Sequence, residues 1–339
     1  MNLQAYVGRR LLVLPLMVLG ITLLTFLLSH AVPSDPVAAN LGDQAAADPA
    51  VVAAFKHRWG LDRPLPEQYV IYLANLVRGD MGISITTHQP VLTDLRQHLP
   101  ATIELATAAM VLSLLAGIPL GIVSAVRRDS LVDQIGRGGS LLGVSMPVFW
   151  LGLVALFVFY ARLGWAPSAG QLSPRLALPP FATGFVVIDA LLAGQTRVAL
   201  DALAHIALPA CVLASSAVGI ITRMMRGSML EVLGEDYVRT ARAKGLAPRR
   251  ITLRHAARNA LLPVITVVGL SFGGLLSGAV VTETVFAWPG LGSYAFLSAT
   301  SLDFPAIMGV GIVVAVVYIL VNLFVDITYA VIDPRIRMG

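Results

Sequence analysis

The sequence predicts an all-α integral membrane protein with six transmembrane helices. Of its 339 residues, 57% are hydrophobic and 13% are charged, and the mean hydropathy is +0.79. Soluble domains carry about 25% charged residues, so the composition is typical of a membrane protein. The formal net charge is +5, but the cations flank apolar runs instead of gathering on one face, which argues against a nucleic-acid-binding protein.

The first predicted span is the uncharged run Leu11–Leu28, whose eighteen residues are at the lower end of a spanning length. A signal peptide is the alternative. Its apolar core would be longer than a typical signal core, and no small-x-small cleavage site follows it. We therefore expect a retained helix.

Five further spans are expected, separated by polar segments. The run Ile206–Thr222 has only seventeen residues and fits if flanking polar groups reach the interface. Charged residues interrupt the apolar patches between Leu176 and Leu203, so that segment is predicted to be a surface hairpin or an amphipathic helix. The other four runs cross a bilayer comfortably and are Leu105–Val126, Gly138–Ala161, Asn259–Thr282 and Phe304–Val325.

The distribution of cations predicts the orientation. If the N-terminus lies inside, the cytoplasmic segments hold 16 of the 24 Lys and Arg residues, and the outer segments hold 8 that are diluted over longer loops. By the positive-inside rule, both termini and the basic loop after the fourth span then lie in the cytoplasm. A seventh span would send the C-terminus outside.

That basic loop, from Gly234 to Pro263, is the longest strongly polar stretch in the second half of the chain. Local signals predict two short helices, with Asp236 capping the first, Gly245 in a left-handed turn after it, and Pro248 in the first turn of the second. The loop holds two anions and seven cations, which are Arg239, Arg242, Lys244, Arg249, Arg250, Arg254 and Arg258.

Two features of the loop indicate docking. The small side chains of Ala241 and Ala243 would let another protein approach closely. The arginines at 250, 254 and 258 recur every four residues and would share one helix face. The loop is interpreted as a docking element between two spans, and the alternative is an ordinary basic cytoplasmic loop.

No catalytic constellation is found in the sequence. A phosphate-binding loop needs glycines followed by Lys and Ser or Thr, but the only lysines, Lys56 and Lys244, precede His and Gly. The six histidines show no metal-ligand spacing, and the single cysteine, Cys211, lies in an apolar segment. We expect no enzyme activity, cofactor or metal site in this chain, so transport driven by ATP would need hydrolysis on another chain.

Polar groups in or beside the spans are the candidates for a transport pathway. Glu104, Glu283 and Asp326 stand at span ends, where a carboxylate is more often capped or snorkelling than functional. Prolines and small residues inside the spans predict tight bundling, or else a polar-lined pathway. The candidates for its lining are Ser145, Met146 and Ser271.

The run Asp236–Gly245, with His255 and Arg258-Asn259-Ala260 before Pro263, resembles the signature loop of ABC-importer permeases. Aspartate and tyrosine replace the usual Glu-Ala-Ala, and the spacing from glycine to proline is longer. This variant resembles the dipeptide/oligopeptide/nickel branch, in particular its B-type permease subunit. Other stretches resemble the same family: Gly20–Phe26 leading to Pro33–Pro36, Trp59–Tyr69, Arg78–Gly82 and Thr282–Gly292.

The resemblance implies a type I ABC-importer permease fold in the bacterial cytoplasmic (inner) membrane. The chain would form half of a pathway for di-/oligopeptides or related small solutes. Its expected partners are a second homologous permease subunit, two ABC ATPase subunits that bind the ATP, and an extracytoplasmic solute-binding protein. The alternative function is a stand-alone ion-coupled secondary transporter.

The same resemblance assigns site residues. Thr282 and Glu283 are candidates for an outer gate, where Glu283 could hold the gate by a hydrogen bond or contact a peptide amino terminus. The residues expected to couple to the ATPases are Asp236, Tyr237, Arg239, Ala241, Ala243, Lys244 and Gly245.

The expected organisation has four parts. Residues 1–33 form a cytoplasmic N-terminus and the first span, and residues 34–99 form an extracytoplasmic region that could contact a solute-delivering protein. Residues 100–330 form the permease core, with a cytoplasmic coupling loop at 227–258 and an extracytoplasmic segment at 163–204. Residues 331–339 form a cytoplasmic tail.

Overall fold

The computed structural model describes residues 15–27, 48–59 and 62–332. Within these ranges the regular structure is helical, apart from one isolated bridge between Ile83 and Pro90. The all-α prediction is confirmed. The predicted family-like stretches before residue 48, except Gly20–Phe26, lie outside the described residues.

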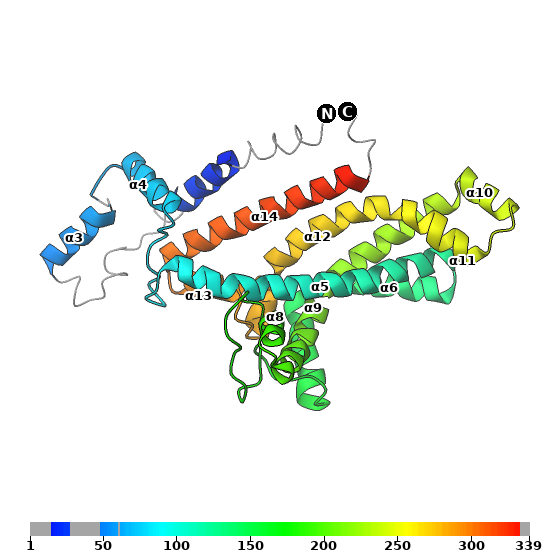
Figure 1. Cartoon of the computed structure of the whole chain (residues 1–339), viewed down its shortest axis with the longest axis horizontal. Helices are drawn as coiled ribbons and strands as arrows, with labels where there is room; N and C mark the ends of the chain where they lie inside the picture. The colour runs from blue at the N-terminus through cyan, green and yellow to red at the C-terminus, as the bar shows by residue number, and fades with distance from the viewer. Residues whose placement is uncertain (1–14, 28–47, 60–61, 333–339) are drawn as a thin grey trace.

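Four long helices run alongside one another and form the body of the molecule: α5 (Val91–Val126), α9 (Thr196–Leu233), α12 (Ala257–Val285) and α14 (Phe304–Ile332) (Figure 1). Shorter elements connect or flank them. They are a helix at Pro15–Leu27, α3 (Pro49–Trp59), α4 (Leu65–Val77), α6 (Leu131–Ser145), α7 (Val148–Ala155), η1 (Leu156–Arg162), α8 (Val186–Leu192), α10 (Asp236–Ala243), α11 (Pro248–Arg250), η2 (Ile251–Ala256) and α13 (Leu291–Thr300). The two η elements are π-helical.

Among the described residues, 4 helical stretches are long and apolar enough to cross a membrane: Val91–Val126, Thr196–Leu233, Pro248–Leu276 and Phe304–Phe324. A fifth crossing results if the bent pair of α6 with α7 and η1 counts as one span. The described part of the first predicted span, Pro15–Leu27, is an apolar helix below spanning length. The number of six spans therefore stays a prediction.

One predicted span is not a straight helix. Gly138–Ala161 was expected to cross as one run, but its two halves, Leu131–Ser145 and Val148–Arg162, meet at 105°. The break lies at Met146, whose ψ of 132° is extended, and at Pro147. A residue before proline disfavours the α conformation and proline has no amide hydrogen to donate, so the helix ends there.

Glycines bring α5 and α9 together in the main core. A Cβ added at Gly117 would lie 2.9 Å from the Ile221 side chain, and one at Gly121 would lie 2.8 Å from the Thr222 carbonyl oxygen. No larger side chain fits at such distances, so the backbones approach closely, as is common between membrane helices. Tight bundling is thus confirmed for these glycines.

The segment predicted as a surface hairpin or amphipathic helix is a loop followed by the short helix α8, and α9 begins at Thr196. Buried Asp189 organises the loop. It accepts hydrogen bonds from the backbone amides of Ala182, Thr183 and Gly184 at 3.2, 2.8 and 2.9 Å and from the Thr183 hydroxyl at 2.6 Å. Burial raises the pKa of the Asp189 carboxyl, but these donors outweigh it and hold the pKa below its usual value.

Asp189→Ala is expected to raise the equilibrium constant for local opening of this loop by on the order of tenfold or more. Each buried amide left without an acceptor costs about 1–3 kcal/mol, and about 1.4 kcal/mol is a factor of ten. Faster proteolysis of residues 181–185, with unchanged cleavage elsewhere, would be the readout. Because the folded-state pKa is lowered, the wild-type loop should keep its protection at neutral pH and lose it only as pH falls through that value.

Candidate coupling site and outer gate

Helix α10, at the end of the molecule opposite α3 and α4, carries the predicted coupling residues (Figure 1). Gly245 follows it with a φ of +75°, and Pro248 begins α11, so both of these local predictions are confirmed. The predicted cap is wrong. Glu235 occupies the N-cap position without a side-chain hydrogen bond, and Asp236 is the first helical residue, where it pairs with Arg239.

The inner face of α10 is apolar and packs within the chain. Val238 and Ala241 are buried, at 0% and 7% exposed, against Ile251 in a cluster completed by Leu233 and Leu246. Ala241 therefore positions the helix and does not offer a free surface. The other predicted coupling residues are all exposed: Asp236, Tyr237, Arg239, Ala243, Lys244 and Gly245.

Two hydrogen bonds connect this end of α9 and α10 to α12. The Asn259 side-chain amide donates to the Tyr237 hydroxyl at 2.7 Å, and the Ser228 hydroxyl donates to the Ala260 carbonyl oxygen at 2.9 Å. A force applied to the outer face of α10 would thus reach two of the apolar helices at once.

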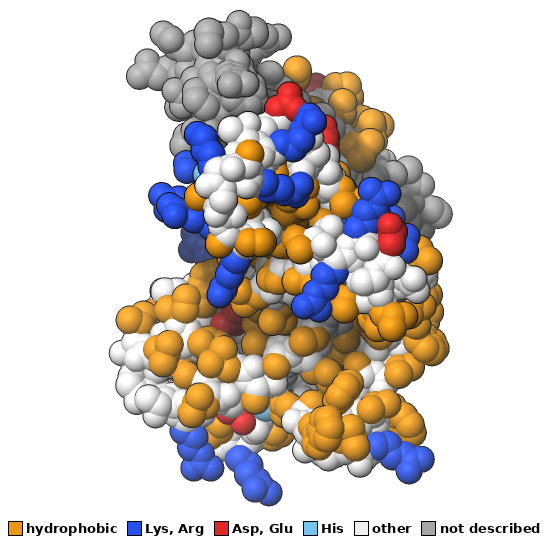
Figure 2. Space-filling view, turned by 90° about the vertical axis from the view of Figure 1, so that its right-hand side faces the viewer, with side chains coloured by type: hydrophobic (Ala, Val, Ile, Leu, Met, Phe, Trp, Pro, Cys, Tyr) orange, Lys and Arg blue, Asp and Glu red, His pale blue; other side chains and the backbone are white. Residues whose placement is uncertain are grey.

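The second half of the basic loop differs from the prediction of a separate short helix. After the three residues of α11 the chain continues through the π-helical η2 directly into α12, so this part is the start of a spanning helix. Arg250, Arg254 and Arg258 are exposed. Figure 2 shows Lys and Arg side chains gathered over much of the upper part of the face at this end of the molecule.

At the other candidate site, Glu283 near the end of α12 is fully buried. Its carboxylate accepts a hydrogen bond from the Thr102 hydroxyl of α5 at 2.6 Å and another from the Ser293 amide at 2.9 Å. Thr102 in turn accepts from the Leu291 amide at 2.7 Å. Glu283 is therefore an internal hydrogen-bond acceptor and not a snorkelling end group.

The turn between α12 and α13 packs closely against this carboxylate. A Cβ at Gly290 would collide with the Glu283 carboxylate, and one at Gly292 would lie 2.5 Å from the Val280 Cα. The buried Trp288 indole donates to the Ala101 carbonyl oxygen at 2.9 Å. The neighbouring Thr282 is also buried. These contacts fix the turn against α5.

Among the residues that the structure describes, no hydrogen bond brings the remaining pathway candidates into one site. Ser145 is exposed and Met146 half-buried at the bend after α6, while Ser271 is half-buried on α12. Glu104 lies inside α5, where it accepts from the Val187 amide at 3.0 Å and the Gln171 side chain at 3.2 Å. The side chain of Asp326 lies outside the described residues.

Sequence reasoning missed two buried aspartates that connect distant segments. Asp303 accepts from the Ser84 hydroxyl at 2.5 Å, and Asp94 accepts from the Thr87 and Tyr294 hydroxyls at 2.6 and 2.9 Å. They fix the turn at residues 84–87 to α13 and to the start of α14. No local pattern indicates the pairs of Asp303 with Ser84 and of Asp94 with Tyr294, because these partners lie 219 and 200 residues apart in the chain.

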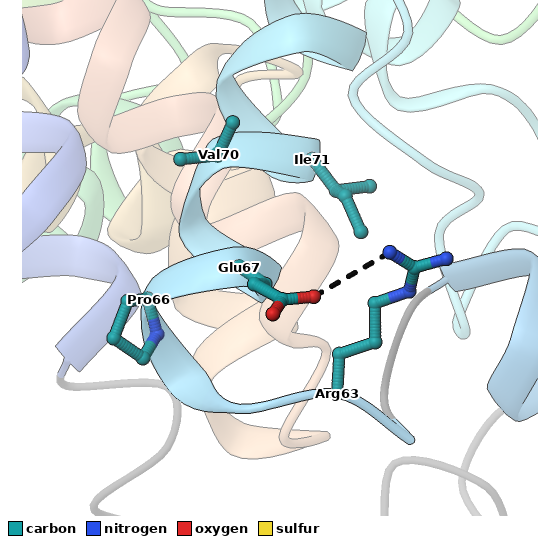
Figure 3. Close-up of a pocket in the computed structure, with 5 residues that line it drawn as sticks. All are labelled: Arg63, Pro66, Glu67, Val70 and Ile71. Atoms are coloured by element: carbon teal, nitrogen blue, oxygen red, sulfur yellow. Dashed lines mark hydrogen bonds and ion pairs between the residues drawn. The ribbon is translucent and has the colours of Figure 1, made fainter.

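A small surface pocket lies beside α4 in the region predicted to be extracytoplasmic (Figure 3). Arg63 and Glu67 form an ion pair of 3.4 Å across it, and Pro66, Val70 and Ile71 complete the lining. Both charged side chains are at least half exposed, so the pair contributes little to stability.

Apolar helices of spanning length around a glycine-packed core, with an exposed basic helix at one end, are the architecture of a multi-pass membrane protein. The chain belongs to the family of binding-protein-dependent transport system inner membrane components: residues 117–338 match the family model of that description, and residues 3–106 match the model of its N-terminal part.

Curated relatives cover nearly the whole chain. A probable D,D-dipeptide transport system permease protein of Escherichia coli K12 is 49% identical over 96% of this chain and 95% of its own length. A di/tripeptide transport system permease protein of Pseudomonas aeruginosa is 45% identical over 98% of each chain. The dipeptide transport system permease protein of E. coli K12 is 43% identical over 98% of each.

A solved structure shows the same fold at low identity. It is a chain of the MetNI methionine ABC transporter, with a TM-score of 0.53 and 16% identity over 71% of this chain and 96% of the other. The predicted fold of an ABC-importer permease is thus confirmed.

Proposed function

We propose that this protein is the transmembrane permease subunit of an ATP-driven importer for di- or oligopeptides, forming half of the translocation pathway. The observation that carries the proposal is the exposed polar face of α10, held in place by Val238 and Ala241 and hydrogen-bonded to α12 through Tyr237. Such a face, directly after the long helix α9 and connected to α12, suits a partner that pushes on the membrane helices.

The peptide substrate is inferred from relatives. Three of them, at 43 to 49% identity over nearly the whole chain, are named for transport of dipeptides or of di- and tripeptides. Much of the choice among peptides would reside in the solute-binding protein.

The proposal includes partners on both sides of the membrane. Two ABC ATPase subunits would bind ATP and dock at α10, a second homologous permease would complete the pathway, and a solute-binding protein would dock outside. This chain would then need no cofactor and catalyse no reaction of its own. Both termini, with residues 331–339, would lie in the cytoplasm, and residues 34–99 and 163–204 outside.

The test is affinity purification of the chain from native membranes, followed by reconstitution into liposomes with a labelled dipeptide and its binding protein. Recovery of two ATPase subunits and a second permease, with uptake that requires ATP, is the expected result. A chain that emerges alone and moves the dipeptide with an ion gradient would instead support the ion-coupled carrier and overturn the proposal.

A further inference from the structure

A buried ion pair joins α6 to α9 near the end of the molecule that carries α10 (Figure 1). Asp133, in the first turn of α6, is fully buried, and the Arg226 side chain of α9 is only 19% exposed. The guanidinium donates through Nε and Nη2 to the two carboxylate oxygens at 2.7 and 2.8 Å. This two-bond geometry fixes orientation as well as distance.

The short turn between α5 and α6 is built to hold Asp133 in place. The Ser130 side chain caps α6 by accepting from the Asp133 amide at 3.4 Å, and the Asp129 amide donates to the Asp133 carboxylate at 3.0 Å. Asp129 itself has a φ of +63°, a conformation that few side chains tolerate. The carboxylate is therefore preset for Arg226.

Arg226 lies on the helix that leads to α10. Helix α9 is unbroken from Thr196 to Leu233, so Arg226 stands about two turns before its end. Any displacement of α10 that tilts or shifts the end of α9 must also move the Arg226 guanidinium.

Beyond the ion pair, the backbones of α6 and α9 also lie close together. A Cβ added at Gly219 would lie 2.5 Å from the Ser140 carbonyl oxygen, and one at Gly143 would lie 2.7 Å from the Ser215 carbonyl oxygen. These contacts set how closely the two helices lie. The two-bond ion pair adds a contact that depends on their relative orientation.

We propose that Asp133 and Arg226 form the joint that transmits motion of α10 through α9 to α6, and so to the bent span that α6 forms with α7. They are positioning residues for transport and touch neither ATP nor solute. This inference rests on the proposed function, since it assumes that an ATPase acts on α10.

The test compares uptake of a labelled dipeptide with ATP hydrolysis in the reconstituted complex. Asp133→Asn leaves the guanidinium buried and unpaired, so the double variant Asp133→Asn/Arg226→Gln is the decisive one, because both charges are gone. Arg226→Lys keeps the charge but loses the planar two-bond contact. Arg128→Gln is the matched control, because its pair with Asp129 is exposed.

In the double variant and in Arg226→Lys, the complex is expected to assemble and hydrolyse ATP while the solute moved per ATP falls at least fivefold, with unchanged KM. Arg128→Gln should keep the wild-type ratio. If the pair is purely structural, the double variant should have the wild-type ratio of solute moved per ATP, because it lacks the unpaired charge that Asp133→Asn leaves. That result would overturn the inference.

If the double variant fails to assemble, Arg226→Lys is the deciding variant. A wild-type ratio of solute moved to ATP hydrolysed in Arg226→Lys would also overturn the inference. Failure of the proposed function looks different, because the wild-type complex itself would then show no uptake dependent on ATP.

Discussion

Gly245→Val is expected to reduce ATP-driven uptake by about tenfold or more while leaving membrane insertion intact. Gly245 follows Lys244, the C-cap residue of α10, with a φ of +75°, where a residue with a Cβ costs roughly 1–2 kcal/mol and a β-branched one more. The lost turn would reorient α10 relative to η2 and α12. Uptake in proteoliposomes, and recovery of the ATPase subunits with the purified chain, measure the effect.

The matched control is Gly245→Asn, because asparagine tolerates the left-handed conformation better than other side chains. A Cβ at this position meets nothing within 4 Å, so neither variant clashes with the rest of the chain. Asn is expected to retain most of the uptake. Equal loss in both variants would show that the glycine surface itself, and not the backbone turn, matters.

Glu283→Gln is expected to lower the maximal rate of uptake by on the order of tenfold without loss of the folded complex. The carboxylate accepts from Thr102 and Ser293, and hydrogen bonds to a charged acceptor contribute about 1.5–3 kcal/mol each. The amide keeps the shape, but only its oxygen can accept, so one of the two hydrogen bonds is lost and the turn at residues 286–292 should loosen from α5. Uptake kinetics at saturating binding protein are the measurement.

A double-mutant cycle with Thr102→Val assigns the effect to this contact. If Glu283 acts by holding the turn through Thr102, the double variant should lose clearly less than the sum of the two single variants, because their shared contact is lost only once. Additive losses would point to contact between Glu283 and solute instead. Unchanged kinetics in Glu283→Gln would exclude Glu283 from gating altogether.

Local chemistry made part of the fold predictable. Long apolar runs predict the membrane spans. The placements of Gly245 and Pro248 follow from the backbone preferences of glycine and proline. The bend at Met146 and Pro147 is a local effect as well. The sequence contained the proline, but the angle of 105° between the halves depends on what each half packs against.

The candidate sites were only partly predictable. The signature of the basic loop identified α10, yet it gave Ala241 the same role as Ala243, although the two alanines face opposite ways in the folded chain. Which side of α10 is buried depends on the residues that pack against the helix. Here Ile251 does so, and it belongs to a later element.

The sequence by itself determined the class of protein, the apolar spans, the basic loop and the sharp turn at Gly245, because hydropathy and backbone preference act within a few residues. Tertiary structure alone decided that Glu283 is an internal acceptor for Thr102 and that Asp133 pairs with Arg226. The partners in each pair lie 181 and 93 residues apart. Such contacts exist only once close helix packing has brought distant segments together and has made an unpaired charge too costly to leave.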